Sequence, residues 1–247
     1  MSMKLIGLRH DIDNNWVFKK GIFSNLLKIE DGYNIRSTFF VRVDTLKSEK
    51  DWNLILEAQD KGWEIGLHLI NTINTPKLPA PREELEILTR KGVKVYGVTP
   101  CGTTIGWIKP DINWAVMDEL GLKYMEGYGK LTKNIYKTFI FNTHLSLDIY
   151  YIRKYGIRKG YELFKRDTYK KILDEGYVTV LTHPEYFGKS VGIWSKNIYV
   201  TKMFNLALTF LKVRTLNKVY EKFLLEHKNY FQLLRYIDLY KKLLKEK

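Results

Sequence analysis

A run of charged residues follows the first apolar segment of the chain. The letters RHDID, at positions 9–13, come directly after Leu5–Leu8, which has the character of a buried strand. Side chains of a strand alternate between its two faces, so Arg9, Asp11 and Asp13 would share one face. The two carboxylates would stand roughly 7 Å apart, so one could hold a metal ion while the other faces a water on that ion. The alternative is that Asp13 caps the next helix and that Arg9 neutralises Asp11.

Two histidines occur where two further expected strands end. In EIGLHLINT, His68 comes directly after the third apolar run, and in VTVLTHPEYF, His183 comes directly after the last one. In a parallel α/β barrel the carboxyl ends of the strands form the active-site rim, so both imidazoles are expected on the rim that carries the aspartates. Asp and His are usual ligands of a catalytic zinc site, which keeps one position open for water. The combination therefore favours a metal site over two ordinary hydrogen-bonded histidines.

The elements that must position these residues alternate along the chain. Short β-branched or aromatic runs predict strands at 5–9, 37–43, 63–67, 93–98, 123–126, 138–142 and 178–182. Segments of helical period predict helices at 17–29, 47–61, 82–91, 110–120 and 157–175. Glycine closes four of these helices, at Gly62, Gly92, Gly121 and Gly176. Seven βα-like units in one domain indicate an α/β barrel with a parallel sheet.

The alternation stops near residue 195. We expect a barrel over residues 1–194 and an amphipathic, Lys-rich helical extension over 195–247. The apolar faces of the extension need a partner, which is either the barrel or a second subunit. The second option would make the protein a homo-oligomer.

Composition limits the partners and the compartment. The 247-residue chain carries 41 Lys and Arg against 27 Asp and Glu, for a net charge of +14, which would suit an acidic partner. The basic residues are spread along the chain without a recognition motif, and this disfavours nucleic acid. Cys101 is the single cysteine, so no internal disulfide can form. No apolar stretch is long enough to cross a bilayer, and we expect a cytoplasmic protein.

Five motifs taken together resemble the polysaccharide deacetylase superfamily, the NodB-like carbohydrate esterases. The motifs are RHDID, RSTFFV, GWEIGLHL, GVTPCG and VLTHPEYF, in the order and at the approximate spacing of that family. The resemblance covers roughly residues 5–187. It is closest to a divergent branch whose first motif reads Arg-His-Asp-x-Asp. It implies a distorted (β/α)7 barrel of the NodB type, to which the chain adds its C-terminal helical extension.

The resemblance also implies a role for each matched residue. Asp11 would be the general base, His183 the general acid, and Asp13 and His68 ligands of a divalent metal ion, with zinc expected. The usual family motif has adjacent aspartates, so Asp11 and Asp13 could exchange these roles. The substrate-binding residues implied are Arg9, Thr72, Pro100, Cys101 and Leu181.

The implied reaction is hydrolysis of a carbon–nitrogen amide bond that is not a peptide bond. The ion would polarise the amide carbonyl and acidify a water, and a carboxylate would take the proton of that water. His183 would then protonate the leaving amine. The expected partner is a carbohydrate or a small amide, and the expected enzyme removes an acetyl or other acyl group from an N-acylated sugar or a related amide.

Two motifs depart from the family pattern. The second motif usually has another histidine four residues after the first, but Thr72 stands there, and a hydroxyl is a poor zinc ligand. The third motif usually opens with an arginine that orients the base; Val98 stands there, and Arg9 or Arg42 would have to replace it. A third ligand would come from His10, His144 or His183, or the site binds metal weakly or not at all. The alternative function is an eroded deacetylase-like barrel that binds a glycan or another anionic partner without turnover.

Overall fold

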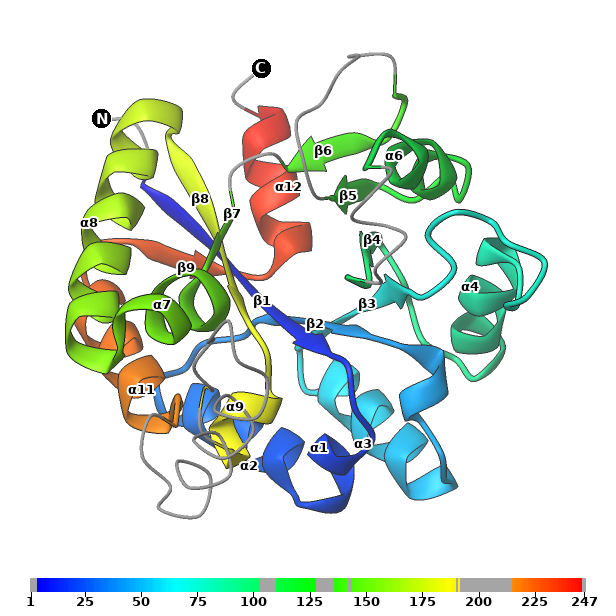
Figure 1. Ribbon diagram of the computed structural model, residues 1–247, viewed down its shortest axis with the longest axis horizontal. Coiled ribbons are helices and arrows are strands. Elements are labelled where there is room, and N and C mark those ends of the chain that lie inside the picture. The colour runs from blue at the N-terminus through cyan, green and yellow to red at the C-terminus, as the bar shows by residue number, and fades with distance from the viewer. Residues whose placement is uncertain are drawn as a thin grey trace, which may run out of the picture. The chain divides into compact units, whose positions relative to one another are not determined.

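Parallel strands and the helices between them make up the computed structural model, which describes residues 4–102, 110–127, 136–141, 144–189, 191 and 215–245. The described chain forms two units, and Figure 1 labels their elements. The first unit comprises Met1–His10, Trp16–Ser37 and Thr143–Leu234. The second unit comprises Asp11–Asn15, Thr38–Asn142 and Arg235–Lys247.

In the first unit, strand β1 (Leu5–Ile12) pairs in parallel with both β8 (Tyr177–Thr182) and β9 (Gln232–Leu234). Strand β7 (His144–Ser146) pairs with β8. The last two residues of β1 belong to the second unit. The helical segments are α1 (Trp16–Lys19), α2 (Ile22–Gly32), the π-helical η2 (Leu147–Ile152), α7 (Arg153–Tyr155), α8 (Ile157–Glu175), α9 (Glu185–Gly188) and α11 (Asn217–His227).

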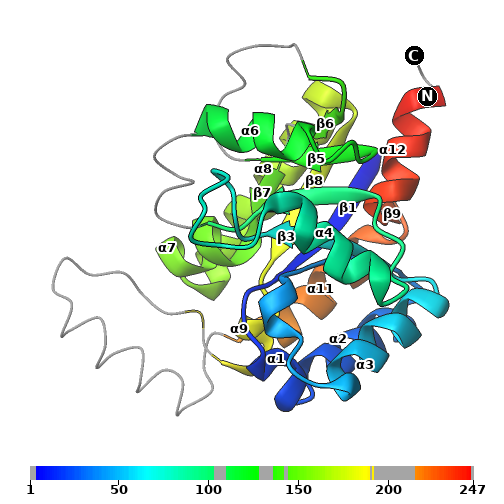
Figure 2. The same cartoon turned by 90° about the vertical axis from the view of Figure 1, so that its right-hand side faces the viewer.

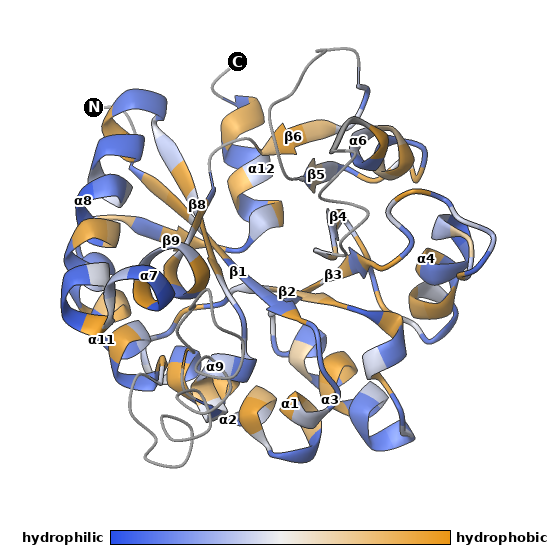
Figure 3. Cartoon of the chain, viewed as in Figure 1, coloured by the Kyte–Doolittle hydropathy of each residue, from blue (hydrophilic) through white to orange (hydrophobic). Residues whose placement is uncertain are grey.

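Helix α8 has the bounds that its sequence pattern predicts. Tyr161, Phe164, Thr168 and Ile172 are buried at intervals of three or four residues, the spacing of one helical face. In Figure 3 hydrophilic and hydrophobic residues accordingly alternate along the helix. Gly176 ends α8 with φ +78, a left-handed conformation that a residue without a Cβ adopts readily, and β8 begins at the next residue.

The helix expected over 17–29 is two helices, α1 and α2. Gly21 separates them with φ +67, and its N–H donates to the carbonyl oxygen of Phe18 at 3.0 Å. An isolated glycine in an apolar pattern is compatible with a continuous helix, so the pattern alone does not reveal the break. Both helices contact α9, which lies beside them in Figure 2.

In the second unit, five parallel strands pair in the order β2 (Thr38–Val41), β3 (Glu64–Leu69), β4 (Gly97–Pro100), β5 (Tyr124–Glu126) and β6 (Phe139–Phe141). The helical segments are η1 (Val43–Thr45), α3 (Glu49–Asp60), α4 (Pro81–Arg90), α6 (Pro110–Asp118) and α12 (Tyr236–Lys245). Ser48 begins α3 as its cap, because its hydroxyl accepts the N–H of Asp51 at 3.3 Å.

Strands and helices succeed one another as they do in a distorted (β/α)7 barrel, which confirms the predicted fold class. All seven expected strands are present, and β7 and β9 are additional. The C-terminal segment contains β9 as well as the expected helices α11 and α12. The boundary expected near residue 195 lies outside the described residues, so the division into 1–194 and 195–247 stays a prediction. Within the described ranges, no helix has the length and hydropathy needed to cross a bilayer.

A buried carboxylate fixes the start of helix α12 within the second unit. Glu64 accepts hydrogen bonds from the hydroxyl of Thr38 at 2.8 Å, from the hydroxyl of Tyr124, and from the backbone N–H of Ile237 at 2.9 Å. Burial raises the pKa of Glu64, and the bonds from Tyr124, Ile237 and Thr38 only partly oppose that rise. The C-terminal helix is therefore attached to a titratable group in the core.

This attachment predicts a pH dependence of stability. Because the folded pKa of Glu64 is raised, its contribution is fully present below about pH 4.5 and is lost as pH rises through the folded pKa. Glu64→Gln cannot titrate, so the free energy of unfolding of the wild type should fall relative to that of the variant as pH rises above about 4.5. Urea unfolding at several pH values measures this difference. A difference that stays constant as pH rises above about 4.5 would contradict the assignment.

Candidate metal centre

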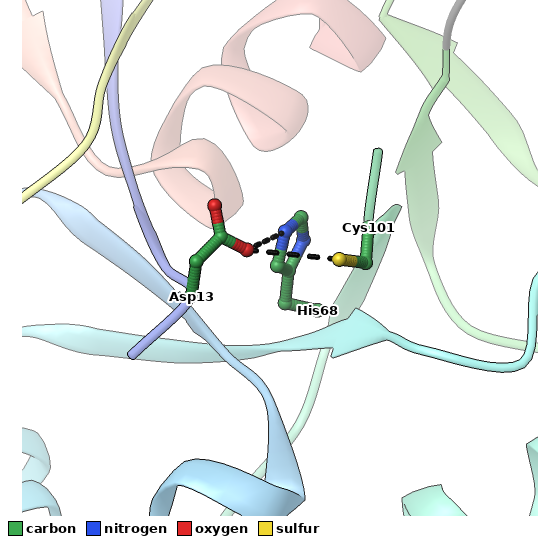
Figure 4. Close-up of side chains that lie close together, drawn as sticks. All are labelled: Asp13, His68 and Cys101. Carbon is green, nitrogen blue, oxygen red and sulfur yellow. Dashed lines mark hydrogen bonds and ion pairs between the residues drawn. The ribbon is translucent and has the colours of Figure 1, made fainter. Parts of the chain in front are cut away.

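Three potential metal ligands meet in the second unit. A carboxylate oxygen of Asp13, a ring nitrogen of His68 and the sulfur of Cys101 all lie within 4.8 Å of one another. Asp13 Oδ1 is 3.2 Å from His68 Nε2 and 3.6 Å from Cys101 Sγ. Figure 4 shows the three side chains pointing toward one another from separate segments of the chain. We call these three residues the Asp–His–Cys cluster.

Strand pairing positions two members of the cluster. His68 lies in β3 opposite Thr99 of β4, and its Nδ1 is 2.8 Å from the Thr99 hydroxyl oxygen. Cys101 follows the end of β4, and its N–H donates to the carbonyl oxygen of Leu69 at 2.7 Å. The register of β3 and β4 thus brings the thiol beside the imidazole. Asp13 lies one residue beyond the end of β1.

Carboxylates around His68 favour a positive charge at this position. Burial alone would lower the pKa of His68, but the charge of Asp11 and hydrogen bonds with Asp13 and Cys101 raise that pKa well above 6.5. Asp11 is fully buried, with its Oδ2 3.9 Å from His68 Nε2, whereas 34% of the Asp13 side chain is exposed. The structure brings together four of the site residues expected from the sequence: Asp11, Asp13, His68 and Cys101, which was expected as a substrate contact.

An arginine adjoins the thiol. Arg42 Nη1 is 3.6 Å from Cys101 Sγ, and Asp44 binds the other side of the guanidinium with distances of 3.0 and 2.6 Å. Burial lowers the pKa of Arg42, but its hydrogen bond with Asp44 and the charges of Cys101, Asp44 and Asp13 raise it overall. Arg42 is one of the two arginines expected to replace the missing arginine of the third motif. In the structure Arg42 lies beside the Asp–His–Cys cluster.

The segment after His68 is fixed by a different carboxylate. Glu84 accepts the backbone N–H groups of Ile70 and Asn71 at 2.9 and 2.8 Å. The side-chain amide of Asn71 bonds to the backbone of Thr75 and of Pro79. Thr72 is buried, and its hydroxyl makes no hydrogen bond to any residue that the structure describes. Asn71 and Thr72 are not part of the Asp–His–Cys cluster.

His183 has a buried carboxylate partner in the first unit. Asp148, in η2, accepts the backbone N–H of His183 at 2.5 Å, and its Oδ2 is 3.0 Å from Nδ1 of the ring. Ser146 and Ile149 also donate to Asp148, at 2.9 and 2.7 Å. Sequence reasoning did not single out Asp148. Asp148 lies two residues beyond β7, a strand that the sequence pattern does not predict, so no strand-end signal marks it.

The remaining site residues from the sequence are buried in the strands. Arg9 and Leu181 lie opposite each other in β1 and β8, and Pro100 ends β4 opposite Leu69. His10, offered by the sequence as a third ligand, is engaged elsewhere: its Nδ1 is 2.6 Å from the hydroxyl of Thr182, and its Nε2 is 2.8 Å from Glu30. Both ring nitrogens of His10 therefore make hydrogen bonds with buried residues of the first unit.

Several solved structures resemble this chain. A family 4 acetyl xylan esterase from Clostridium thermocellum, in complex with a cobalt ion, has a TM-score of 0.49 and 13% identity over 96% of this chain and 91% of its own. A polysaccharide deacetylase from Bacillus cereus has a TM-score of 0.48 and 14% identity over 85% and 88% of the two chains. A CE4 family pseudoenzyme from Bacillus anthracis has a TM-score of 0.44 and 15% identity over 96% and 66%.

No protein-family profile and no curated protein sequence matches the chain. The solved structures found include CE4 family polysaccharide deacetylases, the family that the sequence motifs resemble. They also include a CE4 family pseudoenzyme and a mutant of it with restored enzymatic activity.

Asp148 is expected to be essential for stability as well as for the orientation of His183. In Asp148→Ala the partly buried N–H of His183 loses its acceptor and that of Ile149 keeps only the Ser146 hydroxyl, so the free energy of unfolding should fall by about 3 kcal/mol. Asp174→Ala, at an exposed position of α8, should change it by less than about 0.5 kcal/mol. Urea unfolding of both variants measures the two effects. Equal stability of the two variants would show that the Asp148 contacts contribute little.

Proposed function

We propose that this chain is a metal-dependent hydrolase that removes an acetyl or other acyl group from the nitrogen of an N-acylated sugar or a related small amide. The observation that carries the proposal is the Asp–His–Cys cluster, in which three potential ligand atoms lie within 4.8 Å of one another. A divalent ion bound there would polarise the amide carbonyl and make a water more acidic. The donor set fits zinc, which binds carboxylate, imidazole and thiolate ligands.

The geometry favours one assignment of the two aspartates. Asp13 Oδ1 is 3.2 Å from His68 Nε2 and belongs to the cluster, whereas Asp11 Oδ2 is 3.9 Å from the same nitrogen. Asp13 and His68 would therefore hold the ion. Asp11, buried beside them, would accept the proton of the attacking water. This assignment agrees with the one that the family resemblance implies.

His183 is the proposed general acid. Asp148 lies at Nδ1 of its ring and would fix both the orientation and the tautomer of the imidazole, as a carboxylate does for many catalytic histidines. The other ring nitrogen, Nε2, would then deliver a proton to the leaving amine. Pro184 follows His183 and restricts its backbone, which further limits the positions of the imidazole.

The alternative function is an eroded deacetylase-like barrel that binds a glycan without turnover. Two observations favour it: Thr72 replaces the family's second histidine, and Val98 replaces the arginine of the third motif. One of the similar solved structures is a CE4 family pseudoenzyme. Metal binding and product release distinguish the two functions.

Binding of a divalent ion should depend on Asp13 and His68. Each of the variants Asp13→Ala and His68→Ala removes one ligand, so zinc affinity should fall by more than about 100-fold, because even residues that only support a ligand contribute 10- to 100-fold. Elemental analysis and calorimetric titration measure stoichiometry and affinity. The control Asp60→Ala removes an exposed carboxylate of α3 and should bind zinc as the wild type does. Unchanged binding in both ligand variants would refute the assignment.

His183 should matter for turnover more than for folding. Loss of a general acid lowers the rate by about 10²- to 10⁴-fold, whereas Asp148 in His183→Ala keeps the donors from Ser146, Ile149 and the backbone N–H of residue 183. Release of free amine from N-acetylated oligosaccharides measures activity, and a thermal melt close to that of the wild type confirms folding. Asp174→Ala, at an exposed position of α8, serves as the control and should keep its activity.

Two results would contradict this role. A His183→Ala variant that keeps full activity, or one that unfolds early, would identify a structural histidine. If the zinc-loaded wild type releases no product from any N-acetylated sugar but binds glycans, the eroded barrel is the better description.

A further inference from the structure

We infer that Cys101 is the third protein ligand of the metal site, in the role that a second histidine has in the family motif. This inference rests on the proposed function, because it concerns the same ion. The resemblance implies a substrate contact for Cys101, and the position of its sulfur in the Asp–His–Cys cluster assigns it a different role. The site would then be a mixed carboxylate, imidazole and thiolate centre.

The spacing of the three ligand atoms fits one ion. In a tetrahedral zinc site with bonds of 2.0 to 2.3 Å, neighbouring ligand atoms stand about 3.3 to 3.6 Å apart. The distance from Asp13 Oδ1 to His68 Nε2 is 3.2 Å, and the distance from Asp13 Oδ1 to Cys101 Sγ is 3.6 Å. The third distance, from the histidine nitrogen to the sulfur, is within 4.8 Å, so side-chain adjustment would bring all three atoms onto the same ion.

The surroundings hold the two ligands from the sheet in place. The Thr99 hydroxyl is 2.8 Å from Nδ1 of His68; when Nδ1 donates to it, Nε2 presents its lone pair toward the cluster. The backbone N–H of Cys101 is bonded to Leu69 of the neighbouring strand, which fixes the residue that carries the thiol. A site with such support loses little conformational freedom when it binds an ion.

An arginine lies next to the sulfur of the proposed ligand. A thiolate bound to an ion carries a negative charge, which a neighbouring guanidinium would balance. Arg42 Nη1 lies 3.6 Å from Cys101 Sγ, and Asp44 holds the guanidinium by two hydrogen bonds. Arg42 is thus a positioning and charge-balancing residue for the proposed ligand.

The ligand set has a consequence for metal choice. Thiolate and imidazole ligands select zinc or cobalt over magnesium and calcium, which prefer oxygen ligands. Three protein ligands also leave the fourth tetrahedral position open, which is the arrangement of catalytic zinc sites. The site would therefore keep its open position although Thr72 has replaced the histidine.

Cobalt titration of the metal-free, full-length protein tests the inference without an activity assay. A cysteine thiolate bound to Co²⁺ gives a charge-transfer absorption band in the near ultraviolet, and Cys101 is the single cysteine of the chain. The wild type should develop this band and saturate at one equivalent of Co²⁺. Cys101→Ser should show no band and bind Co²⁺ and Zn²⁺ more than about 100-fold more weakly. Cys101→His, with circular dichroism as the check of folding, should bind Co²⁺ without the band.

The outcomes separate this inference from the proposed function. If the wild type binds one equivalent of Co²⁺ without a thiolate band, the cysteine is not a ligand, although the metal site stands. Unchanged Zn²⁺ affinity in Cys101→Ser would overturn the inference in the same way. If the wild type binds neither ion, the metal-dependent function fails together with the inference.

Discussion

The position of one imidazole determines what the candidate site can do. His68 is buried in the second unit, with Thr99 at one ring nitrogen and the carboxylates of Asp13 and Asp11 at the other. Strand pairing sets this arrangement, because the register of β3 and β4 places Thr99 opposite the histidine and Cys101 just beyond. A shift of one residue in this register would turn each side chain of the strand to the other face of the sheet.

Buried carboxylates hold the backbone at several points of the fold. Glu84 binds the segment that follows His68, Asp148 binds the segment that carries His183, and Glu64 binds the start of α12. In each case an acidic side chain accepts backbone N–H groups that have no strand or helix partner. Without these acceptors the N–H groups would be left without a hydrogen bond, which is costly inside a protein. This arrangement fixes the chain next to the functional side chains.

Much of the fold could be predicted from the sequence. Hydrophobic periodicity and closing glycines predict the order of strands and helices, and α8 has the expected bounds because its buried face and Gly176 both mark it. The break at Gly21 was missed, because a glycine within an apolar pattern does not by itself end a helix. Strand β9 was missed because its three residues lie within a Lys-rich segment that has helical period.

The candidate site could be predicted only in part. Asp11, Asp13 and His68 follow expected strands. Because the carboxyl ends of the strands of a parallel barrel form one rim, residues at these positions are expected to lie close together. A ligand role for Cys101 has no such signal, because its partner Asp13 lies 88 residues away and a single cysteine has no spacing pattern. Asp148 also lacks a strand-end signal, because the sequence pattern does not predict β7. Which of these side chains lie close together depends on strand register and side-chain orientation, and the sequence pattern contains neither.

X-ray absorption spectroscopy of the zinc-loaded wild-type protein tests the central claim most directly, because it reports the atoms bound to the ion. The account predicts one sulfur at about 2.3 Å together with nitrogen and oxygen ligands at about 2.0 to 2.2 Å. A first shell that contains nitrogen and oxygen alone would contradict the Asp–His–Cys centre.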